Sequence, residues 1–114
     1  MTKAPEPAFA DLMDMMRNGN PQVAEDGFAY LKPRAKKHID ELIVVLATET
    51  NHAMKCWLLE LIGEARTERA FVALCAFARS DDGSLREWAV RGLEKLNTKQ
   101  ARTFLFNYDR ASIE

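Results

Sequence analysis

The sequence predicts an all-α fold, an α-solenoid in which antiparallel helical hairpins stack against one another. The first observation is a repeat: residues 54–63 return 31 positions later as residues 85–94, so that Trp57 falls on Trp88. The second is that the same offset aligns two columns of apolar residues: Leu12, Ile43, Leu74 and Leu105, and Met15, Leu46, Phe77 and Tyr108. The third is that no stretch alternates apolar and polar residues as a strand does. Hairpins of this kind bury their apolar faces only by stacking, so we expect about three and a half repeats in a right-handed stack.

Length and charge limit the class of protein. The 114 residues suit one domain, and a hydrophobic fraction of 47% is enough for a core. A net charge of −1 gives no general attraction to phosphate polymers or anionic lipid. Cys56 and Cys75 form no CxxC pair, and no signal peptide or membrane-spanning run is visible. We therefore expect reduced cysteines, a cytoplasmic location and no membrane partner.

The first three helices follow from helical spacing and from helix-end signals. The first is expected over residues 7–17, where apolar residues recur every three to four positions. Asn20 is a good N-cap and Pro21 suits a first turn, so the second helix begins there and runs to about residue 31. The third helix is expected over residues 34–48.

The later helices are marked in the same way. Asn51 caps a fourth helix over residues 52–62, which Gly63 is placed to end. Thr67 is expected to cap the fifth helix, a capping box of Ser84 and Glu87 the sixth, and Thr98 the seventh. The single domain 1–114 is therefore divided into repeats at about 7–33, 34–64 and 67–97, with a closing helix at 98–110.

The second helix of each unit resembles the short HEAT-like repeats of bacterial proteins, of the phycobilisome-lyase type. The pattern is an apolar residue, then Arg, then Ala three positions further on, then a small residue and Leu. It is matched by Leu85, Arg86, Ala89, Gly92 and Leu93. One repeat earlier, with Lys in place of Arg, the corresponding residues are Met54, Lys55, Leu58, Leu61 and Ile62. The copy at Val23, Ala24, Gly27, Tyr30 and Leu31 matches by apolarity and size alone. Tetratricopeptide repeats rank second, since Glu60 and Arg91 stand where that family has Leu.

The resemblance implies a scaffold or partner-binder whose concave surface is lined by the second helices of the units. Trp57 and Trp88 are expected near the edge of this surface, close to each other. They serve either as partly exposed anchors for a partner or as core residues between neighbouring helices. The polar rim around them is predicted to consist of Glu60, Glu64, Arg91 and Lys95.

A basic cluster offers a different kind of site. Lys32, Arg34, Lys36 and Lys37 lie close together and can hold phosphates, or they can form a solvated helix end. The cluster has no aromatic interleaving, and acidic residues accompany the basic ones on the expected concave surface. Nucleic-acid binding is therefore the alternative rather than the leading function.

Enzyme chemistry is not expected. His38 and His52 lack the repeated acidic neighbours of a metal site, and no phosphate-binding glycine loop or nucleophile motif is present. Buried thiols are poor nucleophiles, which argues against catalysis by Cys56 or Cys75. We expect no catalytic residue, no metal and no cofactor. The leading expectation is a non-enzymatic protein-binding module: an adaptor, a regulator or a small inhibitor of the immunity type. The sequence leaves the oligomeric state open.

Overall fold

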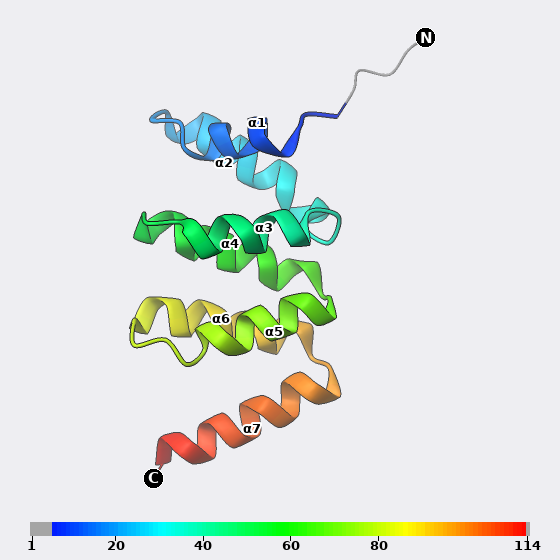
Figure 1. Cartoon of the computed structure of the whole chain (residues 1–114), viewed down its shortest axis with the longest axis vertical. Helices are drawn as coiled ribbons and strands as arrows, with labels where there is room; N and C mark the ends of the chain where they lie inside the picture. Colours follow the sequence, from blue (N-terminus) through cyan, green and yellow to red (C-terminus); the bar gives the residue numbers. More distant parts are fainter. Residues whose placement is uncertain (1–5, 114) are drawn as a thin grey trace.

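A computed structural model describes the backbone of residues 6–113 and the side chains of residues 6–108. This part of the chain contains seven α-helices and no strand: α1 (Phe9–Met16), α2 (Pro21–Leu31), α3 (Ile39–Thr48), α4 (His52–Ala65), α5 (Glu68–Phe77), α6 (Gly83–Leu96) and α7 (Lys99–Ile113), with a 3-10 turn (Lys32–Arg34) after α2. Helices α1, α3, α5 and α7 form one layer, which we call the A layer (Figure 1). Helices α2, α4 and α6 lie behind them and form the B layer.

Side-chain caps begin most of the helices at the predicted residues. Asn20 Oδ1 accepts a hydrogen bond from the backbone N–H of Gln22 at 2.9 Å, and Asn51 Oδ1 accepts one from Met54 at 2.9 Å. Thr67 and Thr98 cap α5 and α7 through their hydroxyl oxygens, each at 3.1 Å. These four caps are confirmed, and each satisfies a backbone donor that the first helical turn leaves without a partner.

The cap of α6 is not the predicted capping box. Asp82 Oδ1 accepts the backbone N–H of Leu85 at 3.1 Å, and the helix already begins at Gly83. Asp82 lies one full repeat after Asn51, and Asn51 lies one full repeat after Asn20. The capping residues of the B-layer helices therefore recur every 31 residues, and Ser84 falls inside the helix.

Helix α3 begins later than predicted, at Ile39 instead of residue 34. The position that holds a capping threonine in α5 and α7 is occupied by Lys36, and α3 has no side-chain cap. Cations are also unfavourable at the positive end of a helix dipole, whereas Asp40 and Glu41 in the first turn of α3 are favourable. The basic stretch therefore stays outside the helix as turns.

Gly63 does not end α4, contrary to the prediction. The helix continues to Ala65 and closes at Arg66 in the left-handed conformation (φ 53°), just as Asn97 closes α6 (φ 49°). Gly63 is buried where α4 crosses α6, and a Cβ atom there would lie 2.9 Å from the Cα of Gly92. The glycine thus serves close helix packing rather than helix termination.

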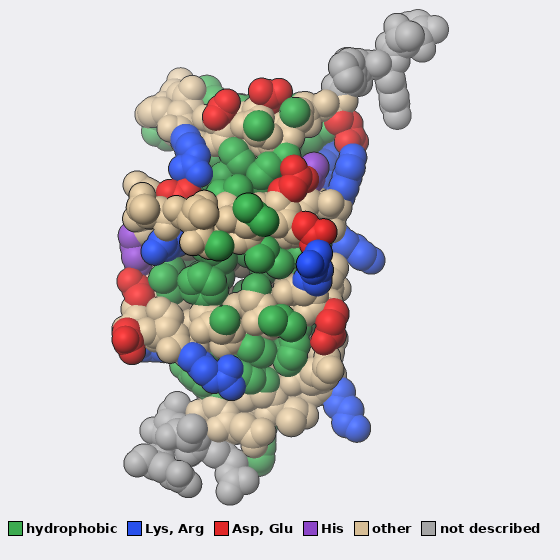
Figure 2. Space-filling model, in the orientation of Figure 1, with side chains coloured by type: hydrophobic (Ala, Val, Ile, Leu, Met, Phe, Trp, Pro, Cys, Tyr) green, Lys and Arg blue, Asp and Glu red, His purple; other side chains and the backbone are tan. Residues whose placement is uncertain are grey.

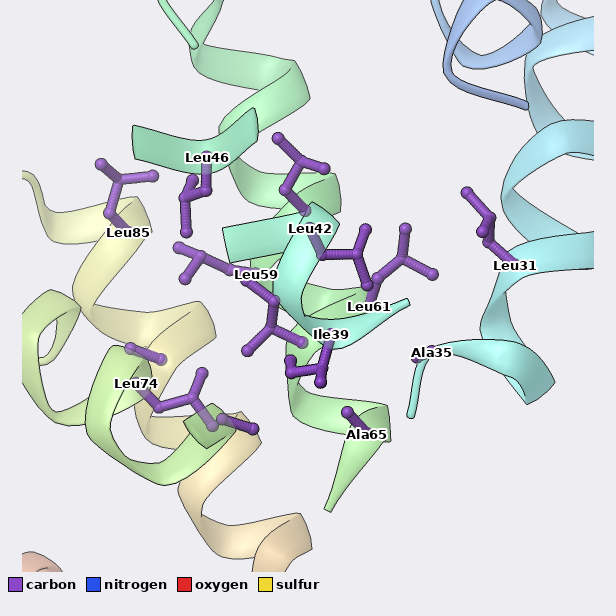
Figure 3. Packing of buried hydrophobic residues seen from close by; sticks show 14 of the residues in the cluster. Leu31, Ala35, Ile39, Leu42, Leu46, Leu59, Leu61, Ala65, Leu74 and Leu85 are labelled. Atoms are coloured by element: carbon purple, nitrogen blue, oxygen red, sulfur yellow. The ribbon is translucent and has the colours of Figure 1, made fainter. Parts of the chain in front are cut away.

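The core runs without interruption from α1 to α7. Figure 3 shows part of it, where leucines of neighbouring helices come together. The largest fully buried side chains are Leu12, Leu31, Leu42, Leu58, Leu59, Leu61, Ile62, Leu74 and Leu93. Both predicted columns lie in or against this core, since every member is buried or half-buried. The most extensive contact between helices is that of α4 with α6.

Ion pairs link successive hairpins at a nearly constant spacing. In the described part of the chain, five ion pairs and one histidine–aspartate hydrogen bond join residues that are 29 to 32 positions apart. They are Glu6–Lys37, Arg17–Glu49, Lys32–Glu64, Asp40–Arg69, His52–Asp82 and Glu64–Lys95. This spacing matches the offset of the sequence repeat, so residues at similar repeat positions meet in space.

Candidate protein-binding surface

The structure brings four of the six predicted partner-binding residues around one hollow. Glu60, Trp88, Arg91 and Lys95 line a pocket of about 120 Å³ between α4 and α6, together with Gly63 and Gly92. The two glycines are buried and bring the helix backbones into contact. We call this group of six residues the α4–α6 surface. Its floor is backbone, and its walls are one indole and three charged side chains.

Trp88 is the apolar centre of this surface. The side chain is half-buried, and the Arg91 guanidinium lies 5.1 Å from the ring centroid, within range of a cation–π interaction. Arg91 also donates a hydrogen bond to Glu87 at 2.6 Å. The indole is therefore partly in the core and partly exposed to solvent. The Arg91 guanidinium beside it is held in position by its hydrogen bond to Glu87.

Glu64, the fifth predicted residue, reinforces one side of the hollow. It forms an ion pair with Lys95 and lies 4.0 Å from the amine of Lys32. The Glu64 side chain is only 18% exposed, so its charge is largely used within the protein. Glu64 thus holds Lys95 in place and offers little surface of its own to a partner.

Trp57 does not join Trp88, contrary to the expectation that the two indoles lie together. Its ring stacks on Phe28 of α2, with centroids 4.9 Å apart and an interplanar angle of 25°. The cause is the register of α4 against α6. The helices cross where Gly63 meets Gly92. These two glycines are closer together in the sequence than Trp57 and Trp88, which are one full repeat apart, so the two indoles are not brought opposite each other. The two tryptophans consequently line separate hollows.

The hollow beside Trp57 lies between the first and second hairpins. It encloses about 530 Å³ and is lined by Met16, Arg17, Pro21, Ala24, Glu25, Asn51, Ala53, Met54 and Trp57. Arg17 at its edge is bonded to Glu49 at 2.5 Å, and the Glu49 side chain is only 5% exposed. That hydrogen bond holds the pKa of Glu49 below its ordinary value, so the carboxylate is charged at neutral pH.

Three of the four cations in the predicted basic cluster already have partners within the chain. Lys37 pairs with Glu6 at 2.5 Å, and Lys32 faces Glu64. Arg34 lies over the ring of Tyr30, 3.7 Å from its centroid, and donates to the Tyr30 carbonyl. Among the four cations only Lys36 lacks an ion-pair or cation–π partner within the part of the chain that the structure describes. Phosphate binding would have to break these contacts.

The two thiols are partly buried, and both histidines are bonded to carboxylates. Burial raises the pKa of both Cys56 and Cys75, and the negative charge of Asp82 adds to the rise at Cys56. The histidines are engaged: His38 bonds Glu41 at 2.8 Å and His52 bonds Asp82. Between residues 6 and 108, no three His, Cys, Asp or Glu side chains gather as metal ligands would.

One apolar surface was missed by the sequence reasoning. Val44 of α3 and Val72 of α5 are 65% and 61% exposed, and both line a hollow of about 610 Å³ in the A layer. The signal in the sequence was composition rather than periodicity, because residues 70–78 contain no polar side chain. A helix that is apolar on all sides is normally covered on all sides.

No protein-family model, curated protein or solved structure matches this chain significantly. In the described residues, no helix has the length and apolarity needed to cross a bilayer. The geometry of the molecule is therefore the basis for assigning a function.

Proposed function

We propose that this chain is a HEAT-like α-solenoid that binds another protein through the α4–α6 surface. In this proposal α1–α2, α3–α4 and α5–α6 are three repeats in a right-handed stack, and α7 is the first helix of a fourth. The recurrent caps at Asn20, Asn51 and Asp82 and the ion pairs between equivalent repeat positions support the repeat. Stacks of this kind offer extended surfaces suited to macromolecular partners.

The observation that carries the binding site is the position of Trp88. A half-buried indole lies beside a hollow with a backbone floor, and Glu60, Arg91 and Lys95 surround it. Interfaces combine an apolar centre with a polar rim, and Trp and Arg dominate their binding energies. A protein or peptide that inserts a small apolar side chain against Trp88 fits this arrangement. No catalytic step, cofactor or membrane contact is part of the proposal.

The experiment compares the wild-type chain with the double variant Trp88→Ala, Arg91→Glu as baits in an extract of the native host. Proteins retained by the wild type and lost by the variant support the α4–α6 surface, provided that circular dichroism and the Tm show an intact fold. Lys99→Glu, a charge reversal at an exposed position of α7, is the matched control and is expected to retain them. Equal retention by all three chains would exclude this surface.

Nucleic-acid binding is the weaker candidate, because three of the four predicted cations have partners within the chain. Phosphate contacts make affinity fall steeply with ionic strength. The test is binding of a mixed-sequence DNA or RNA duplex at about 50 mM and about 200 mM salt. Binding that is lost at the higher salt concentration, and that Lys36→Glu weakens, would support a nucleic-acid-binding function.

A further inference from the structure

The outer side of the A layer carries apolar side chains where a solvent-facing helix normally has polar ones. In Figure 2, which faces the A layer, hydrophobic side chains appear over α3 and α5. The outward stripe of α3 consists of Asp40, Val44 and Ala47, and that of α5 consists of Arg69, Val72 and Ala76; all six are exposed. Beyond the first turn of either helix, the stripe contains only valine and alanine.

The contrast with the B layer shows that this is a property of one side of the molecule. Helix α6 exposes Glu87, Arg91, Glu94 and Lys95, as a solvated helix does. Folded monomers rarely expose contiguous apolar patches larger than a few hundred Å². The hollow between α3 and α5 has a volume of about 610 Å³, and it is lined by Ile43, Val44, Val72 and Ala73 together with the charged Asp40, Glu68 and Arg69.

The charges at the two ends of α5 show what kind of helix fits there. Glu68 begins α5 and has no ion-pair partner among the described residues, while Arg79 follows its last turn. Arg79 is exposed, with its guanidinium 4.7 Å from the ring centroid of Phe104. A second α5 lying antiparallel to the first brings each Glu68 opposite an Arg79. A parallel arrangement brings like charges together.

We infer that the chain forms a two-fold symmetric dimer in which the A layers of two copies meet, with α5 antiparallel to α5. In this arrangement α3 of one copy faces α3 of the other, so Val44 and Val72 of each copy pack against the same residues of the second copy on either side of the hollow between α3 and α5. Ala47 and Ala76 permit close approach of the helices, because they have little side chain to separate them. Each Glu68 pairs with Arg79 of the second copy, so every contact occurs twice. The α4–α6 surface lies on the other layer and remains open to a partner.

The experiment measures the mass of the full chain by sedimentation equilibrium from about 1 to about 500 μM, a range that covers ordinary dimer affinities. The wild type is expected to approach twice the chain mass of 12.9 kDa. Val44→Glu and Val72→Glu are each expected to weaken association at least about 30-fold, because a charge is then buried without a partner. Their helical content should be unchanged, since both side chains are exposed in the single chain. Ala29→Glu, at an exposed position of α2 in the B layer, is the matched control and should remain dimeric.

Charge reversal tests the orientation. Glu68→Arg alone and Arg79→Glu alone should each weaken the dimer, and the two together should restore it. A wild-type chain that stays monomeric throughout, valine variants that dimerise like the wild type, or charge reversals without mutual rescue would each overturn the proposal. If the chain were monomeric, the apolar outer side of the A layer would instead be a binding surface for a different protein.

Discussion

The hairpin α3–α4 meets its two neighbours in different ways. Toward the third hairpin, α4 contacts α6 closely, and the backbones touch at Gly63 and Gly92. Toward the first hairpin, α4 contacts α2 sparsely, and the Phe28–Trp57 stack stands beside a hollow of about 530 Å³. One repeat before the two glycines the chain has Lys32 and Leu61. Side chains of that size do not permit the close backbone approach that Gly63 and Gly92 allow, and the α2–α4 interface is the more open of the two.

The largest effect is expected from Leu74→Ala, on α5, whose side chain packs against Gly92 of the closed interface. Leu74 is fully buried beneath Gly92, so its truncation should lower the free energy of unfolding by about 2–5 kcal/mol. Chemical denaturation followed by circular dichroism measures it. Because one buried cluster includes residues of all seven helices, a single transition should shift as a whole. An unshifted second transition would contradict this cooperativity.

A smaller loss is expected when a methyl group is added where the backbones touch. Gly63→Ala places a Cβ 2.9 Å from the Cα of Gly92, which cannot yield as a side chain can. Overpacking of this kind costs about 1–3 kcal/mol. Gly19→Ala is the matched control, since nothing lies within 4 Å of its added Cβ.

The closed interface also predicts a specific non-additivity. A Cβ at Gly92 would lie 2.9 Å from Leu74 Cδ2, so Gly92→Ala should destabilise the wild type. In the Leu74→Ala background much of that clash is removed, and the same substitution should cost less. A double-mutant cycle of unfolding free energies measures the difference. Strict additivity would show that the contact with Gly63 alone sets the cost.

At the open interface, the Phe28–Trp57 stack should contribute less. Both rings are half-buried, and an aromatic pair adds about 0.5–1.5 kcal/mol beyond burial. Phe28→Leu combined with Trp57→Leu in a cycle measures this coupling. Hydrogen exchange should accelerate in α1 and α2 more than in α4 and α6. A uniform acceleration would mean that the first hairpin is no less tightly attached than the third.

Acid should weaken the open interface through the Arg17–Glu49 pair. Because the pKa of Glu49 is lowered in the folded chain, the pair stabilises above the ordinary value of 4.5 and loses its contribution as pH falls through the lowered value. Below pH 4.5, the exchange protection of α1 should fall faster than it does in Arg17→Gln, which has already lost the pair. Parallel acid profiles for the two chains would contradict this role of Glu49.

Local helix signals were predictable, while contacts between helices were less so. Asn20, Asn51, Thr67 and Thr98 were recognisable as caps because a side-chain oxygen satisfies nearby backbone donors. Gly63 was assigned to a helix end, which is its commonest use, but its neighbour across space is Gly92. The residues at which two helices cross depend on how the helices pack in the folded chain, and local sequence patterns do not predict them.

The candidate surface shows the same division. The alignment of Trp57 with Trp88 placed both on B-layer helices, yet a crossing offset shorter than the sequence repeat sends Trp57 toward Phe28. Glu60, Arg91 and Lys95 were grouped with Trp88 because they follow one another on helix faces. The apolar outer side of the A layer was not predicted, because the helical spacing identified a buried stripe on α5 but did not show that Val72, outside that stripe, is exposed.

The caps have a consequence for how such a chain can change in length. A segment from just after Asn51 to Asp82 contains one B-layer helix, one A-layer helix and the start signal of the following helix. A tandem duplication of that segment would give every helix a start signal of its own and would preserve the spacing of the ion pairs. A chain of this architecture can therefore gain or lose a whole 31-residue unit by a single duplication or deletion. Insertion of a few residues would instead disrupt the spacing of the caps and ion pairs.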